Sequence, residues 1–168
     1  MCPRRSVLYI SALLLGLQYA SAQTAPLWTS SFNAPGNNAD NAYAMAIDRW
    51  GNIHVAGDGR TGATTTDSVD FVVVKYAPAG DTLWARFYNG TGNRRDVARA
   101  TAVDNEGNVY VAGESYGSTD YDIAVVKYNA AGVQRWAVRY NGPANGADGA
   151  FAIALDSTGN VIVTGYSD

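Results

Sequence analysis

Apolar and polar residues alternate along several short segments of the chain. The segments 53–57 and 82–88 change from apolar to polar at almost every step, which is typical of strands with one buried face. Together with the apolar runs near them, they predict four strands, at 43–48, 52–57, 70–76 and 82–88. The connections at 48–52 and 77–80 carry Asp, Pro and Gly, residues that favour tight turns, with Gly supplying a positive φ.

This pattern recurs along the chain. The segment 46–57 returns at 102–113 and at 154–165, and the segment 72–76 returns at 124–128. A tryptophan lies 20 residues before the aspartate of each long segment, in the pairs Trp28 and Asp48, Trp84 and Asp104, and Trp136 and Asp156. The repeat is therefore about fifty residues long. Its length changes only between the glycine of the long segment and the next apolar run, which predicts a loop there.

Four antiparallel strands at such a period indicate a blade of a β-propeller. The motifs are Ala-x-Asp-x-x-Gly-Asn-x-x-Val-x-Gly, then Asp-Phe-Val-x-Val-Lys-Tyr, then Gly-x-x-x-Trp-x-x-x-Tyr. In this order the chain resembles the SBBP-type β-propeller repeat family of exported bacterial proteins, with a hairpin motif like that of NHL repeats. The resemblance runs from about Leu27 to the last residue. It implies the fold and export, and it carries no catalytic residue.

The fold class predicted is all-β, with antiparallel four-stranded propeller blades and about two and a half blades in an open or incomplete ring. Residues 23–42 form a lone fourth strand and a crossing loop. Residues 43–98 and 99–150 form blade repeats 1 and 2, and residues 151–168 form a truncated repeat 3. Known rings have roughly 4 to 8 blades. We therefore expect missing blades from a longer chain, or self-association that closes the ring.

Residues 1–22 have the three-part layout of a secretory signal peptide. Arg4 and Arg5 precede an apolar stretch at 7–17, and small residues at 20–22 predict cleavage after Ala22. A membrane span needs about 20 apolar residues, so we expect none in the mature chain. The protein is then secreted, periplasmic or attached to the cell surface. The single cysteine, Cys2, leaves with the leader, so the exported chain forms no disulfide.

Charge changes the picture little. The formal charge is −3, and removal of Arg4 and Arg5 with the leader makes it −5. Nucleic-acid binding needs a basic patch, so no nucleic-acid partner is expected.

The loops divide between the two ends of the blades. Turns between strands one and two and between three and four are short and lie at one end. The two-to-three loops and the blade crossings lie at the other end, and they are longer and more varied. These variable segments are 34–42, 58–69, 90–97, 114–119 and 142–148. Because binding usually occupies variable loops on a rigid scaffold, the sequence predicts a ligand at this end.

The chemistry of these loops leaves alternatives open. Carboxylate and amide oxygens suit Ca²⁺, and the calcium candidates are Asp67, Asp70, Asp120 and Asp122. The other interpretation is that Asx side chains cap turns, and it is favoured because no EF-hand or nonapeptide pattern is present. Tyr116 and Tyr121 could stack on sugars, or they could be ordinary strand residues.

Catalytic patterns are scarce. His54 is the only histidine, and the equivalent residues Tyr110 and Ile162 indicate that it packs between blades. No Gly-x-Ser-x-Gly motif accompanies it. Trp28, Trp84 and Trp136 are interpreted as packing between blades, although quinoprotein propellers also repeat a docking tryptophan. No catalytic residue is assigned.

We therefore predict an exported propeller-repeat module that serves as a binding or structural scaffold, with carbohydrate or protein at the cell surface as its partner. Two alternatives remain: part of a propeller enzyme acting on polysaccharide, and a scaffold or adhesion array of a larger surface protein.

Overall fold

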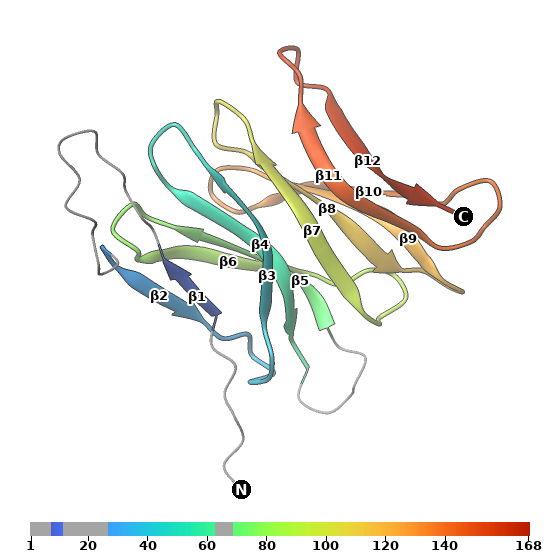
Figure 1. Cartoon of the computed structure of the whole chain (residues 1–168), viewed down its shortest axis with the longest axis horizontal. Helices are drawn as coiled ribbons and strands as arrows, with labels where there is room; N and C mark the ends of the chain where they lie inside the picture. Colours follow the sequence, from blue (N-terminus) through green and yellow to red (C-terminus); the bar gives the residue numbers. More distant parts are fainter. Residues whose placement is uncertain (1–7, 12–26, 63–68) are drawn as a thin grey trace, which may run out of the picture.

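The chain folds into β-strands that form a row of stacked sheets (Figure 1). The computed structural model describes residues 8–11, 27–62 and 69–168, and these contain no helix, hence none that could span a membrane. The strands are β1 (Leu8–Ser11), β2 (Thr29–Phe32), β3 (Asn41–Ile47), β4 (Ile53–Arg60), β5 (Val69–Tyr76), β6 (Thr82–Tyr88), β7 (Asp96–Val103), β8 (Val109–Tyr116), β9 (Tyr121–Tyr128), β10 (Gln134–Tyr140), β11 (Asp148–Leu155) and β12 (Val161–Ser167).

Two sheets are complete antiparallel meanders of four strands. Their orders are β3-β4-β5-β6, which we call blade 1, and β7-β8-β9-β10, which we call blade 2. β11 and β12 pair alone as the first half of a third blade, and β1 pairs with β2. The inner strands β3, β7 and β11 run side by side (Figure 1). The predicted fold class, partial propeller blades in an open arrangement, is therefore confirmed.

The turn between the first two strands of each blade is built by one aspartate. In blade 1, Oδ1 of Asp48 accepts hydrogen bonds from the backbone N–H groups of Trp50 (3.0 Å) and Asn52 (2.9 Å). The Asn52 side chain donates to the other carboxylate oxygen at 2.8 Å, and Gly51 adopts a φ of 81°. Asp104 and Asp156 repeat this arrangement. This explains why Asp-x-x-Gly-Asn recurs at fixed spacing.

The core lies between the sheets, because β4 and β5 are buried on both faces and β9 is buried on every second residue. On one face of blade 1, Phe71 and Val73 pack into a cluster with Val111 and Val126 of blade 2. On the other face, Val72 and Val74 of β5 pack with Trp28 and Phe32, which belong to the segment that contains β2. Burial of each such side chain stabilises the fold by about 1.5–3 kcal/mol. The blades are thus held together by apolar packing, with period-two alternation directing side chains to both neighbours.

Two tryptophans, Trp84 of β6 and Trp28 next to β2, dock onto the third-to-fourth-strand turn of the next blade. Nε1 of Trp84 in blade 1 donates to the carbonyl oxygen of Ala130 in the β9–β10 turn of blade 2, at 3.2 Å. The ring lies on Gly132, where an added Cβ would be 2.9 Å from the indole. Trp28 makes the equivalent contact, donating to the carbonyl of Pro78 at 2.9 Å. Interblade packing, the interpretation favoured from the sequence, describes both residues.

The strands extend further into the variable-loop end than the sequence predicted. β4 runs to Arg60 and β8 to Tyr116, while β7 already begins at Asp96. Residues 58–60, 114–116 and 96–97, predicted as loop, are therefore strand residues. The ends of these strands are hard to predict from sequence because polar residues occupy them. The backbone pairing nevertheless continues there, as between Asp58 and Phe71.

Part of the predicted leader lies in a strand. β1 pairs antiparallel with β2, with Leu8 opposite Phe32 and Ser11 opposite Thr29. This register matches the pairing of third and fourth strands in blade 1, where Phe71 lies opposite Tyr88. The rest of the predicted signal peptide, including its cleavage site, lies outside the described residues.

Candidate functional site

The blade crossings at the variable-loop end share one architecture. An asparagine side chain donates to the side-chain oxygen of a second asparagine four residues later, and that second asparagine has a positive φ of 53°, 48° or 52° at Asn37, Asn93 and Asn145. An aspartate three residues further on accepts the backbone N–H of the residue six positions before it. Those aspartates are Asp40, Asp96 and Asp148. In the crossings, these Asx side chains therefore cap turns, as the favoured interpretation held.

A hydrogen-bonded network joins the strand ends of blade 2. Arg139 at the end of β10 donates to Oγ of Ser115 (2.6 Å) and to a carboxylate oxygen of Asp122 (2.6 Å). Asp96 accepts backbone N–H groups of Gly90 and Tyr116 at 2.7 and 3.1 Å. Burial raises the pKa of Asp96 above its ordinary value, although hydrogen bonds from Ser115 and these N–H groups oppose the shift. The network ties the loop-end residues of β7, β8, β9 and β10 together.

A pocket of about 450 Å³ opens beside this network. The crossing into blade 2 supplies Thr91, Gly92 and Arg94, and the end of β8 with its loop supplies Tyr116, Gly117 and Ser118. The Arg94 guanidinium lies 4.8 Å from the centroid of the Tyr116 ring. None of the described residues that line the pocket is a carboxylate, so it offers a cation, the hydroxyl groups of Thr91 and Ser118, and backbone groups to a ligand.

Tyr116 and Tyr121, the pair considered for sugar stacking, contact each other. Their rings meet edge to face, with centroids 5.3 Å apart. The Tyr116 hydroxyl donates to the carbonyl of Thr119 at 2.7 Å. Because Arg94 covers one ring face and Tyr121 approaches the ring as well, Tyr116 is a wall of the pocket rather than a free platform.

The calcium candidates are in different situations. Asp67 lies outside the described residues. Asp70 accepts a hydrogen bond from the Thr61 hydroxyl, and Asp122 is paired with Arg139. Asp120 lies in the β8–β9 loop, where its carbonyl accepts the N–H of Gly117. Among the residues that the structure describes, no three His, Cys, Asp or Glu side chains form a group that could hold a metal ion.

His54 is fully buried at the opposite end of blade 1. Its Nε2 lies 3.2 Å from a carboxylate oxygen of Asp48, and Nζ of Lys75 lies 3.4 Å from the same oxygen. Burial lowers the pKa of His54 below its ordinary value, against the opposing effect of Asp48. In blade 2 the Tyr110 hydroxyl takes the place of the imidazole, donating to Asp104 at 3.1 Å. His54 thus lies in the packing between blades, as its repeat equivalents indicated.

A second pocket, of about 520 Å³, separates the first turns of blades 2 and 3. Between blades 1 and 2, the corresponding space holds the Trp50 ring, which lies against Gly107. Glu106 replaces that tryptophan in the next repeat and lines the pocket with Lys127. The repeats therefore differ at this end also, although its backbone turns are uniform.

Each first strand carries a feature that the sequence reasoning missed. The pairing of β3 with β4 skips Tyr43, that of β7 with β8 skips Arg99, and that of β11 with β12 skips Phe151. These are β-bulges, which re-aim the extra side chain. The sequence feature that indicates these bulges is the last glycine of the long repeat segment. At Gly57, Gly113 and Gly165, an added Cβ would lie within 1.9 Å of the carbonyl oxygen of the bulged strand.

Comparisons with known proteins give partial likenesses. No family model matches the chain. It is 31% identical over 156 residues to the regulatory protein FlaEY of Caulobacter vibrioides, covering 82% of this chain and 16% of that protein. It is 26% identical over 118 residues to an uncharacterised WD repeat-containing protein of Acanthamoeba polyphaga mimivirus, covering 60% of this chain and 8% of that protein. The chain therefore spans a small part of both relatives.

Solved structures resemble the fold. A protein of unknown function from Bacteroides caccae has a TM-score of 0.52 at 16% identity, with 86% of this chain and 44% of that chain covered. The periplasmic gluconolactonase of Pseudomonas aeruginosa has a TM-score of 0.51 at 14% identity, with 95% and 47% covered. These likenesses and the stacked four-stranded sheets identify the fold as propeller-like.

Proposed function

We propose that the chain is an exported β-propeller repeat module that serves as a binding or structural scaffold, with its ligand at the variable-loop end. Its repeat motifs resemble the SBBP type, and we assign it to that group on the order and spacing of the three motifs. The partner is carbohydrate or protein at the cell surface or outside the cell.

The observation that carries this proposal is the pocket beside Tyr116. Most of its wall residues differ between repeats, whereas the strands beneath them are braced by Arg139 and Asp96. Variable side chains on a rigid frame are typical of a binding surface. The pocket lining contains no pair of carboxylates, so glycoside hydrolysis by two acids receives no support from it.

Binding is tested with arrays of bacterial surface polysaccharides and peptides, probed with the exported protein. We expect at least one class to bind, and Arg94→Ala to weaken that binding tenfold or more. Glu106→Gln, at the opposite end of blade 2, is the matched control and should leave binding unchanged. Equal losses in both variants, or no binding by the wild type, would contradict a ligand site at the loop end.

Export is tested separately by mass spectrometry of the mature protein. We propose that Gln23 is its first residue, because Ala20-Ser21-Ala22 provides the small residues that cleavage requires. Cleavage there would remove β1 and free the edge of β2 that pairs with it. A mature protein that retains Leu8–Ser11 would contradict the proposed leader.

We further propose that strands from additional blades, or from a second copy of the chain, pair with β12. In blades 1 and 2 the second strand has neighbours on both sides, whereas among the described strands β12 pairs only with β11. A synthetic peptide of residues 120–128, a third-strand sequence, should therefore bind this edge and raise the melting temperature. The same peptide with Val125→Pro is the control, because proline interrupts strand pairing. The absence of any difference between them would contradict strand addition.

A further inference from the structure

We infer that the first and second strands of the blades carry a binding site for a neutral oligosaccharide, formed by Tyr43, Arg99 and Phe151 of β3, β7 and β11 together with Glu114 of β8 and Tyr166 of β12. We call these five residues the inner row. The inference deepens the proposed binding function by assigning a ligand class and a second set of contact residues near the loop end. It rests on that proposed function.

The β-bulges place the row. Tyr43, Arg99 and Phe151 are the skipped residues of β3, β7 and β11, so all three occupy the same position in successive repeats. A bulge interrupts the regular pairing of the two strands and turns one side chain in a new direction. Because inner strands of successive blades lie side by side, three identical bulges bring three re-aimed side chains into one line.

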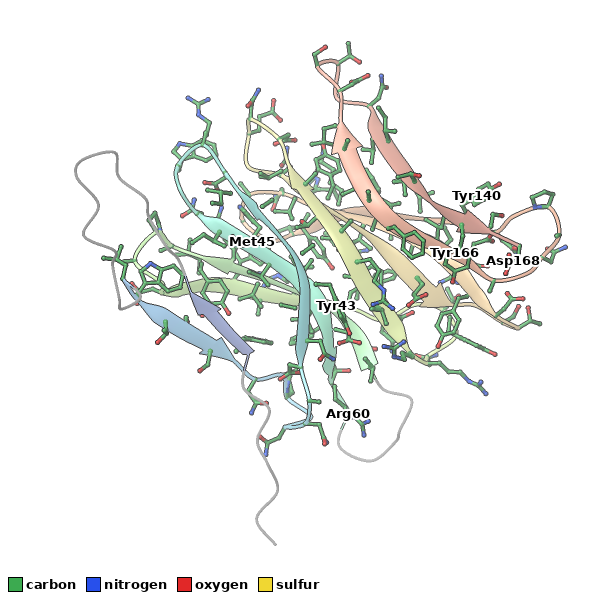
Figure 2. All side chains as sticks on the ribbon, viewed as in Figure 1. Tyr43, Met45, Arg60, Tyr140, Tyr166 and Asp168 are labelled. Carbon is green, nitrogen blue, oxygen red and sulfur yellow. The ribbon has the colours of Figure 1, made fainter. Side chains whose placement is uncertain are left out.

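Contacts between the side chains connect the line across all three blades. The Arg99 guanidinium lies 4.8 Å from the centroid of the Tyr43 ring and donates to Glu114 at 2.6 Å. The Tyr166 hydroxyl lies 3.4 Å from the other Glu114 oxygen, and its ring centroid is 5.4 Å from that of Phe151. Figure 2 shows Tyr43 and Tyr166 on either side of β7.

Two aromatic rings of the row are exposed, whereas Arg99, Glu114 and Tyr166 are partly buried beside them. Tyr43 is 42% exposed and Phe151 is 63% exposed, whereas aromatic residues of the core, such as Phe71, are fully buried. Exposed aromatic rings held by neighbouring side chains lose little conformational entropy when a ligand stacks on them. Exposed rings contribute little buried area to the stability of the fold, but they remain available to a ligand.

The charges of the row indicate the ligand class. Arg99 and Glu114 compensate each other, so the row presents no free charge to an ion. It does present aromatic faces next to a guanidinium and a carboxylate that can donate to and accept from hydroxyl groups. A pyranose ring combines an apolar C–H face with a rim of hydroxyl groups, and a neutral oligosaccharide matches this row.

The test is calorimetric titration of the exported protein with neutral hexasaccharides of glucose (α-1,4 and β-1,4), mannose, xylose and N-acetylglucosamine. We expect at least one to bind. Tyr43→Ala and Phe151→Ala should each weaken binding tenfold or more, whereas Tyr43→Phe should retain most of it because the ring remains. Tyr140→Ala removes an equally exposed aromatic ring from β10, outside the row, and should leave binding unchanged. Thermal melts of every variant verify folding.

The outcomes separate the two proposals. If the array shows binding that depends on Arg94 but no hexasaccharide binds, the proposed function stands and the oligosaccharide site is overturned. The site is also overturned if a hexasaccharide binds equally well to Tyr43→Ala and Phe151→Ala. A peptide from the array whose binding is lost in those two variants would overturn the carbohydrate class. If nothing binds in either experiment, both proposals fail.

Discussion

Single residues explain most of the conserved spacing within the repeats of this chain. The two carboxylate oxygens of the aspartate in each first turn accept hydrogen bonds from the backbone and the side chain of the asparagine four residues later, which closes the turn. The glycine that ends the motif recurs for a different reason: it has no Cβ, so the bulged strand can approach its backbone closely. Positions that look equally invariant in the sequence therefore serve different physical requirements.

The bulge glycine gives a prediction about stability. In Gly113→Ala, the added Cβ would lie 1.9 Å from the carbonyl oxygen of Val97, so we expect a loss of about 3 kcal/mol or more in the free energy of unfolding. Gly159→Ala is the control, because its φ of 86° is strained for alanine but no atom lies within 4 Å. It should cost about 1–2 kcal/mol. Urea unfolding measures both, and equal losses would contradict the bulge.

His54 gives a prediction about pH. Because burial lowers the pKa of the folded-state imidazole, the unfolded chain takes up a proton more readily than the folded chain as the pH falls below 6.5. Stability should therefore decrease from pH 7 to pH 5. His54→Tyr imitates the Tyr110 arrangement of blade 2 and should remove this decrease. An unchanged pH dependence of the melting temperature in the variant would show that another group is responsible.

Protonation of Asp48, which contacts His54, should reduce the stability further at lower pH. Burial opposes ionisation of Asp48, but hydrogen bonds from Asn52 and His54 lower its pKa to about 2. The folded-state pKa is depressed, so the stability from this carboxylate is present above about pH 4 and is lost towards pH 2. Unfolding measured from pH 5 to pH 2 should show a smaller decrease for Asp48→Asn than for the wild type.

At the scale of elements, the fourth strand links one blade to the next. Trp84→Phe removes the indole donor to Ala130 and part of the contact with Gly132, and we expect it to cost about 1–2 kcal/mol. Trp136 is the matched residue of blade 2. Its ring contacts Tyr110, but the described residues include no following blade turn for it to meet. Trp136→Phe should cost less, and a similar cost for both would argue against docking.

The strands could be predicted within a few residues because alternation and turn chemistry act locally. β6 has the predicted bounds, and β5 begins one residue early. The bulges could not be predicted from alternation, since one skipped residue looks like ordinary variation at Tyr43 or Phe151. The inner row combines residues of β3, β7, β8, β11 and β12, and nothing in the local pattern brings Glu114 next to Arg99 and Tyr166.

At the scale of the whole molecule, similar blades present different side chains at the variable-loop end. The variable-loop end was predictable from loop lengths and the meander topology. The hydrogen-bond partners of its polar side chains were not, because they depend on tertiary contacts. Arg139 pairs with Asp122 from 17 residues away, and the turn-capping aspartates at 40, 96 and 148 bind their own backbone.

The central claim is that blades 1 and 2 stack as neighbouring propeller blades, joined at both their outer and inner edges. A nuclear Overhauser spectrum of the isotope-labelled protein tests it most directly. The account predicts cross-peaks between the Trp84 indole N–H and Ala130, and between the Arg99 side chain and the Tyr43 ring. A spectrum with the pairings inside each sheet but neither of these two contacts would contradict it.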